Sequence, residues 1–170
     1  MVVDTILFGD CRETLKEFDG KARTCVTSPP YYGLRDYGGE ESQIGQEQTP
    51  EEYIQNLVEV FRSVRDVLTD DGTLWVNIGD SYYNYRPGKG QALPKQTVSK
   101  TKQDLPDKCA KRGNKLEGLK EKDLIGIPWM LAFALRADGW YLRQDIIWHK
   151  PNPMPESVKD RCTKSHEYLF

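Results

Sequence analysis

The apolar and polar positions of this chain follow two periods, which predict helices and strands in turn. The clearest helix begins at Pro50, after Thr49 as a candidate N-cap, and its acidic first turn suits the helix dipole. Apolar residues recur along it at helical spacing, at Tyr53, Leu57, Val60, Phe61, Val64 and Leu68. The run Asp70-Asp71-Gly72 is expected to end this helix.

The other elements follow from the same periods. Further helices are expected over 13–18 and 124–137, and strands are expected over 2–8, 22–27, 73–78, 141–149 and 166–170. This alternation predicts an α/β fold with a parallel sheet, in which ligands bind at the carboxyl ends of the strands.

Polar and aromatic residues follow four of the expected strands. They are Asp10 after the first strand, 28–31 after the second, 79–82 after the third and 149–152 after the fourth. Because the carboxyl ends of parallel strands meet at one edge, these residues are expected to form a common site.

The most distinctive of these ends is Thr27-Ser28-Pro29-Pro30-Tyr31. Proline fixes φ and has no N–H, so the carbonyls of Ser28 and Pro29 are available as acceptors outside the sheet ladder. Acceptors of this kind, in a dry pocket, suit the exocyclic amine of a nucleobase, and Tyr31 would stack on an extruded base. The alternative is an ordinary Pro-Pro turn with a half-buried tyrosine.

Composition limits the function further. The chain has 170 residues, enough for one domain, and 24 Lys and Arg against 26 Asp and Glu give a net charge of −2. A uniformly basic DNA-binding surface is therefore excluded. The segment 86–122, however, carries eleven basic residues against four acidic ones, a net charge of +7.

That basic segment lacks apolar periodicity, which predicts a mobile loop over about 84–122. Beside an active site it would contact DNA phosphates, with Arg112 as one candidate. The alternative is a solvated insertion without a ligand.

The four cysteines form no CxxC pair, and Cys162 with His166 is only half of a zinc site, so no metal is predicted. Cysteine usage indicates a reduced, cytoplasmic protein. No run of residues is apolar enough to predict a membrane span.

Thr-Ser-Pro-Pro-Tyr after a short strand resembles motif IV of the DNA amino-methyltransferases, which act on cytosine N4 or adenine N6. Other segments resemble the same family in its permuted, beta-type motif order. They are Phe8-Gly9-Asp10, 74–82 (Leu-Trp-Val-Asn-Ile-Gly-Asp-Ser-Tyr), Ile127-Pro128-Trp129 and 145–157 (Asp-Ile-Ile-Trp-His-Lys-Pro-Asn-Pro-Met-Pro-Glu-Ser). The resemblance covers most of the chain.

This resemblance implies a Rossmann-like fold, S-adenosylmethionine as the cofactor and double-stranded DNA as a partner. It implies that Ser28, Pro29, Pro30 and Tyr31 are catalytic. Asp10 and Asp80 would contact the cofactor, with the base edge as an alternative for Asp80 and the N-cap of the next helix as an alternative for Asp10. Tyr32, Tyr82, Lys150, Asn152 and Arg112 would contact DNA or the base. Trp75 and Trp129 are expected in the core. Serine at the first motif position favours cytosine N4 over adenine N6.

The family carries a Gly-rich cofactor loop in its C-terminal part, and residues 1–170 contain no strand-to-helix turn of that kind. The sheet is therefore expected to be incomplete on its cofactor side and to associate with a complementary half or with itself. Two alternatives stay open. One is a catalytically incomplete fragment that binds DNA or a partner, and the other is a general nucleotide-binding module.

Overall fold

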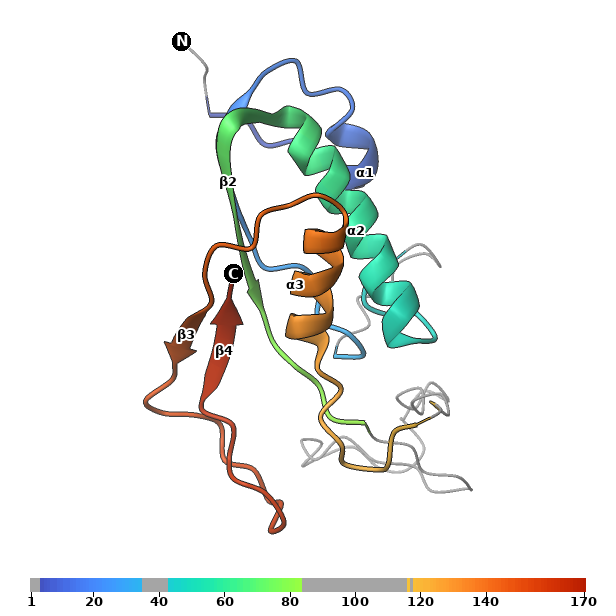
Figure 1. The fold of residues 1–170 in the computed structure, drawn as a ribbon, viewed down its shortest axis with the longest axis vertical. Coiled ribbons are helices and arrows are strands. Elements are labelled where there is room, and N and C mark those ends of the chain that lie inside the picture. The colour runs from blue at the N-terminus through green and yellow to red at the C-terminus, as the bar shows by residue number, and fades with distance from the viewer. Residues whose placement is uncertain (1–3, 35–42, 84–115, 117) are drawn as a thin grey trace, which may run out of the picture.

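A four-stranded sheet with two helices packed on one face makes up the core of the protein (Figure 1). The computed structural model describes residues 4–34, 43–83, 116 and 118–170. Its elements are α1 (Cys11–Thr14), β1 (Ala22–Thr27), α2 (Pro50–Val67), β2 (Leu68–Ile78), α3 (Ile127–Ala137), β3 (Ile146–His149) and β4 (His166–Leu169).

The sheet has the strand order β1-β2-β4-β3 and is mixed. Strand β1 runs parallel to β2, whereas β4 runs antiparallel to both β2 and β3. Strands β1, β2 and β3 are therefore parallel to one another, as predicted, and β4 is inserted between two of them in the opposite direction. The carboxyl ends of three strands and the start of β4 consequently share one edge.

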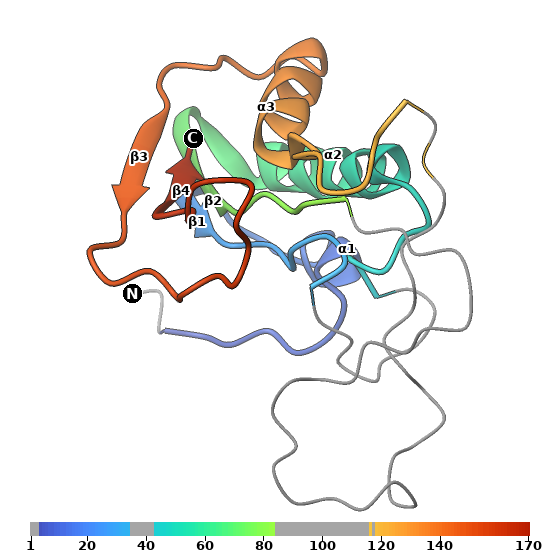
Figure 2. The same cartoon turned by 90° about the horizontal axis from the view of Figure 1, so that it is seen from below.

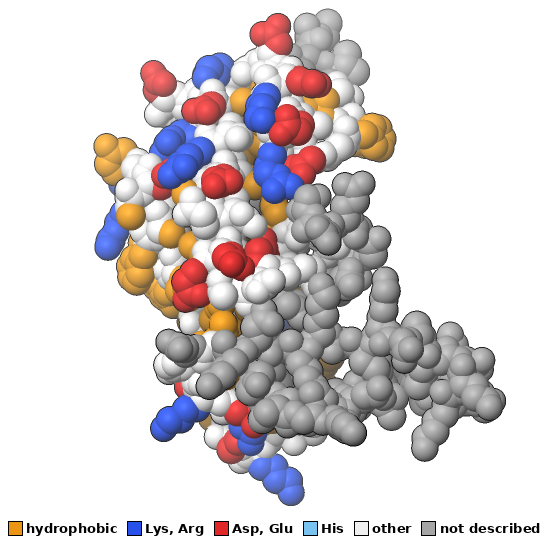
Figure 3. All heavy atoms as spheres, turned by 90° about the vertical axis from the view of Figure 1, so that its right-hand side faces the viewer, with side chains coloured by type: hydrophobic (Ala, Val, Ile, Leu, Met, Phe, Trp, Pro, Cys, Tyr) orange, Lys and Arg blue, Asp and Glu red, His pale blue; other side chains and the backbone are white. Residues whose placement is uncertain are grey.

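Helices α2 and α3 pack against each other and against the same face of the sheet (Figure 2). Tyr53, Leu57 and Phe61 of α2 are almost completely buried, as are Ile78 of β2 and Leu131 of α3. These residues belong to one apolar cluster. The helical spacing seen in the sequence therefore marks the face of α2 that meets the sheet. Figure 3 shows the outer, solvated side of the helical layer, where acidic and basic side chains are interspersed.

A capping box sets the start of α2 at the predicted residue. The Thr49 hydroxyl accepts from the backbone N–H of Glu52 at 3.2 Å, and the Glu52 carboxylate accepts from the backbone N–H of Thr49 at 3.2 Å. Pro50 occupies the first turn, where its missing N–H costs nothing.

Replacing Thr49 by alanine is expected to lower the free energy of unfolding by about 1 kcal/mol, because one N-terminal N–H loses its acceptor. Urea denaturation followed by circular dichroism measures this change. Thr163→Ala, at an exposed position outside the helices and strands, is the matched control and should leave stability nearly unchanged.

The end of α2 differs from the prediction. The helix stops at Val67, and Leu68 already has an extended backbone and starts β2. Ala22 pairs with Leu68 and Thr24 with Thr73, so the bulge between them accommodates the residues that were expected to form a turn. Tertiary pairing with β1 overrides the local turn preference of Asp70-Asp71-Gly72.

The prediction of a strand over 2–8 is wrong for residues 4–8, the part of this range that the structure describes. Residues 4–10 adopt no regular structure, and Ile6 and Phe8 are 77% and 88% exposed. The run has strand-like composition, but no described strand pairs with it, and an unpaired strand leaves its backbone groups without partners.

Three further elements are shorter than predicted. Helix α1 is a single turn capped by Asp10. Helix α3 starts at Ile127 because Gly126 has a left-handed φ of 88°, which is not helical. Strand β3 starts at Ile146, which faces Leu169 at the end of β4.

The second face of the sheet is covered by neither α2 nor α3. The register puts Val26 beside Trp75 on this face, and Glu167 beside Trp148. Val26 is 73% exposed and Trp75 is 40% exposed. The prediction that Trp75 is a core residue is therefore wrong, whereas Trp129 packs edge-on against Tyr168 and Phe170.

Candidate active site

The shared edge of the sheet gathers three of the four predicted polar ends. Residues 28–31 follow β1, 79–82 follow β2 and 149–152 follow β3, while His166 and Glu167 begin β4 at the same edge. Asp10 is the exception, since no strand precedes it in the described residues.

The turn after β1 is anchored to α2. Pro29 is buried, and the hydroxyl of the buried Tyr53 donates to the Pro30 carbonyl at 2.8 Å. Burial raises the pKa of Tyr53, so this phenol keeps its proton. The contact occupies the Pro30 carbonyl, which leaves the carbonyls of Ser28 and Pro29 as the predicted acceptors for an amine.

The Tyr31 hydroxyl lies at the centre of a polar cluster on the face of the sheet opposite to α2 and α3. It is 3.0 Å from Asn77 Oδ1 and 3.2 Å from Glu167 Oε2. Ser28 Oγ is 3.5 Å from both the Tyr31 hydroxyl and Asn77 Oδ1, which is the limit of a hydrogen bond. The described residues thus bond the serine hydroxyl only weakly.

Glu167 connects this cluster to the end of β3. Its Oε1 atom accepts from Lys150 Nζ in an ion pair. Burial by itself raises the pKa of Glu167, but the hydrogen bond and positive charge of Lys150 outweigh it, and the pKa lies below its ordinary value. Glu167 is therefore a carboxylate near neutral pH.

Neither Asn77 nor Glu167 was predicted as a site residue. Asn77 is a polar residue within the otherwise apolar run 74–78, whereas Glu167 follows His166 at the polar start of β4. The isolation of Asn77 is a signal in the sequence, but it does not show that β2 and β4 lie side by side.

The Tyr31 ring packs against the backbone of Gly79. A Cβ atom at Gly79 would lie 2.7 Å from Tyr31 Cε2 and 3.0 Å from Cδ2. The ring therefore packs directly on the backbone of residue 79, and only glycine allows this approach.

Gly79→Ala is expected to displace the Tyr31 ring and to destabilise the protein by about 1–3 kcal/mol, as overpacking does. Gly20→Ala is the matched control, because the added Cβ would meet only the end of the Phe18 side chain. Urea denaturation compares the two variants. Equal stabilities would contradict the close seating of Tyr31 on Gly79.

The two other predicted tyrosines have internal contacts. The Tyr32 ring lies 5.5 Å from Tyr53, and its hydroxyl donates to the Gln48 carbonyl at 3.3 Å. Burial raises the pKa of Tyr32 to about 12. The guanidinium of Arg161 lies 3.5 Å from the centre of the Tyr82 ring. The structure does not test either residue's predicted contact with DNA.

Asp80 has a structural role that the sequence analysis missed. Its Oδ1 atom accepts from the backbone N–H groups of Ser81 at 2.9 Å, Gly126 at 3.0 Å and Ile127 at 3.0 Å. Because the N-cap Gly126 has no side chain, the Asp80 carboxylate performs the capping of α3 from the end of β2.

Asp10, the second predicted cofactor residue, caps α1, which is the alternative interpretation of this residue. Its Oδ1 accepts from Arg12 N at 2.9 Å, and its Oδ2 lies 2.5 Å from the Arg12 guanidinium. Hydrogen bonds from the Arg12 side chain and backbone lower the pKa of Asp10 to about 2. The carboxylates of Asp10 and Asp80 thus both accept hydrogen bonds from groups of this chain. In this arrangement they do not fit a direct contact with a cofactor. Their cofactor role stays a prediction.

The predicted DNA contacts are dispersed. Lys150 pairs with Glu167, Asn152 is exposed in the segment between β3 and β4, and Arg112 lies outside the described residues together with most of the segment 84–122. The described residues contain no group of three or more metal-ligating side chains and no helix long and apolar enough to cross a membrane.

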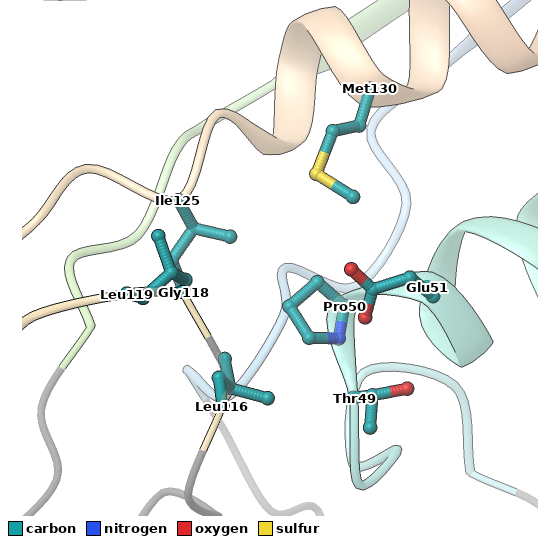
Figure 4. A pocket seen from close by; sticks show the side chains of 8 residues that line it. All are labelled: Thr49, Pro50, Glu51, Leu116, Gly118, Leu119, Ile125 and Met130. Carbon is teal, nitrogen blue, oxygen red and sulfur yellow. The ribbon is translucent and has the colours of Figure 1, made fainter.

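A cavity of about 550 Å³ lies between the start of α2 and the segment before α3. Figure 4 shows Pro50 and Glu51 on one side, Ile125 and Leu119 on the other, and Met130 of α3 reaching in. None of the predicted site residues that the structure describes lines it. The predicted site residues after β1, β2 and β3 lie at the polar edge of the sheet and not in this cavity.

The mixed α/β sheet carries the Ser-Pro-Pro-Tyr turn at its polar edge, where the resemblance to the DNA amino-methyltransferases placed it. Residues 22–170 match the DNA methylase family N6_N4_Mtase, and the chain belongs to this family. The resemblance stated from the sequence is thus confirmed.

The chain is similar to curated type II methyltransferases. It is 53% identical to M.SmaI of Serratia marcescens, covering 97% of this chain and 54% of that protein. It is also 53% identical to M.Cfr9I of Citrobacter freundii, covering 98% of this chain and 53% of that protein. The chain spans about half the length of these relatives.

Two solved structures share the fold. A putative DNA modification methylase from Thermus thermophilus, TTHA0409, solved with S-adenosyl-L-methionine, matches with a TM-score of 0.57 and 21% identity over 95% of this chain and 49% of that one. The PvuII DNA methyltransferase, described as cytosine-N4-specific, matches with a TM-score of 0.58 and 16% identity over 95% of this chain and 45% of that one. The predicted α/β class, with a partial Rossmann-like sheet, is confirmed.

Proposed function

We propose that this chain is the amine-binding and catalytic part of a DNA methyltransferase that modifies the exocyclic amine of a base extruded from the duplex. S-adenosylmethionine, when bound, supplies the methyl group. The observation that carries the proposal is the Ser28–Tyr31 turn, anchored by α2 at one end and by β2 and β4 at the other. The type II methyltransferase names of the relatives support it.

The chain's own residues have a definite task in this proposal. An exocyclic amine is a weak nucleophile because its lone pair is delocalised into the ring. Ser28 Oγ and the Ser28 and Pro29 carbonyls would accept its two N–H groups and hold the nitrogen in line for attack. The weak internal bonding of Ser28 Oγ supports this, since the hydroxyl can exchange those contacts for the substrate. Tyr31 would stack on the base.

Cytosine N4 is the target that we propose, with adenine N6 as the alternative. Serine occupies the first motif position, and the related PvuII enzyme is described as cytosine-N4-specific. A hydroxyl and a carboxylate both accept from an amine, so the chemistry of the turn is compatible with either base.

Double-stranded DNA is the proposed partner, with phosphates contacted by the basic segment 86–122.

The exposed Val26 and Trp75 support a second partner, either a complementary methyltransferase part or a second copy of the chain. A monodisperse monomer in light scattering at micromolar concentration would contradict association with a second copy of the chain.

The deciding experiment is transfer of radiolabelled methyl from S-adenosylmethionine to mixed-sequence DNA, followed by digestion to nucleosides. Label in N4-methylcytosine is the expected result, and label in N6-methyladenine would reassign the base. If no label appears with this chain or with a longer polypeptide that includes it, the alternative of a catalytically incomplete DNA-binding or partner-binding module is favoured. Protection of one specific base from chemical probes would then exclude a general nucleotide-binding module.

A further inference from the structure

Glu167 lies 136 positions after Tyr31 in the chain, and its carboxylate faces the tip of the Tyr31 ring. We infer that Glu167 is a positioning residue, which holds Tyr31 in the orientation needed to stack on a base. The contact between Glu167 and Tyr31 is given by the geometry alone. Its role in base stacking rests on the proposed function.

The first support is the way in which the Tyr31 hydroxyl is bonded. A phenol has one proton, and two acceptors face it, Asn77 Oδ1 at 3.0 Å and Glu167 Oε2 at 3.2 Å. The Asn77 side chain has its oxygen toward Tyr31 because its Nδ2 donates to the Tyr168 carbonyl at 3.3 Å. The hydroxyl therefore has no competing donor in either of these positions.

The second support is that Glu167 is itself held in place. Lys150, after β3, donates to Oε1 and leaves Oε2 toward Tyr31. A hydrogen bond to a charged acceptor is stronger than one between neutral groups. The ring is thus fixed at its tip by β4 and β2 and at its face by Gly79. Such redundancy is typical of a side chain whose orientation matters for function.

A titration of Tyr31 tests the contact without methyl transfer. Site-specific 3-fluorotyrosine at position 31 reports the phenol pKa by 19F NMR. Burial and then the charge of Glu167 raise the pKa of Tyr31. Glu167→Gln should therefore lower this pKa, and Lys150→Met, which leaves the carboxylate uncompensated, should raise it.

Opposite shifts support the inference, because a general loosening of the site would move both variants in one direction. Shifts in the same direction, or no shift in either variant, would overturn it. Glu13→Gln is the matched control, since Glu13 is paired with Lys16 at 2.9 Å on exposed α1. It should leave the pKa of Tyr31 unchanged.

Kinetics then test the link to function in the protein that carries this chain. Glu167→Gln and Tyr31→Phe should each lower kcat about tenfold with little change in KM for DNA, the loss expected for a hydrogen bond to a charged group. If Glu167 acts through the Tyr31 hydroxyl, the double variant should be no slower than Tyr31→Phe. A full further tenfold loss in the double variant would overturn the inference.

If the wild-type protein transfers no methyl group, the proposed function fails, and the titration by itself decides whether Glu167 orients Tyr31.

Discussion

Ser28→Ala is expected to slow methyl transfer by about 10²- to 10³-fold, the usual cost of removing one preorganised hydrogen-bonding group at a reacting centre. Among the described residues the hydrogen-bond contacts of the serine hydroxyl are both 3.5 Å long, so its removal should change stability by less than about 0.5 kcal/mol. Single-turnover transfer from S-adenosylmethionine to DNA measures the first effect, and urea denaturation measures the second.

Two comparisons make this result specific. Ser63→Ala removes a hydroxyl that also lies 3.5 Å from its acceptor, the Glu59 carbonyl, but on α2, and it should leave the rate unchanged. Ser28→Asp keeps an acceptor at the same position and should retain more activity than Ser28→Ala. A Ser28→Ala variant as fast as the wild type would show that the turn does not hold the amine through this side chain.

Asp80→Ala is expected to have the largest effect on folding, a loss of about 2–3 kcal/mol, because two N–H groups at the start of α3 and one after β2 lose a charged acceptor. Ser81, Gly126 and Ile127 all donate to this carboxylate. Urea denaturation gives the total loss, and amide hydrogen exchange should show that the first turn of α3 opens earliest.

Asp80→Asn separates charge from hydrogen bonding, since an amide oxygen still accepts, and it should lose less stability than Asp80→Ala. Asp70→Ala, at an exposed position of β2, is the matched control and should be nearly neutral. Wild-type stability of Asp80→Ala, combined with weaker binding of S-adenosylmethionine, would instead favour the cofactor role predicted from the sequence.

The candidate site was only partly predictable. Ser28, Pro29 and Tyr31 stand together in the sequence, and their unusual chemistry is visible without a structure. Asn77 and Glu167 were missed because their meeting depends on the pairing of β2 with β4, which no local pattern in the sequence shows. Asp80 was predicted to contact a cofactor, since nothing local to it indicates that the N-terminus of α3 lies 46 positions further on.

Local signals in the sequence were enough to determine β1 and the start of α2. Strand β1 occupies the predicted residues, and the Thr49–Glu52 capping box starts the helix through interactions within four residues. The insertion of β4 between β2 and β3, the length of β2 and the absence of a strand over the described residues 4–10 depended on the tertiary structure. The physical reason is that a helix satisfies its backbone groups within its own segment, whereas a strand exists only where a neighbour supplies the hydrogen bonds, and that neighbour is chosen by the fold.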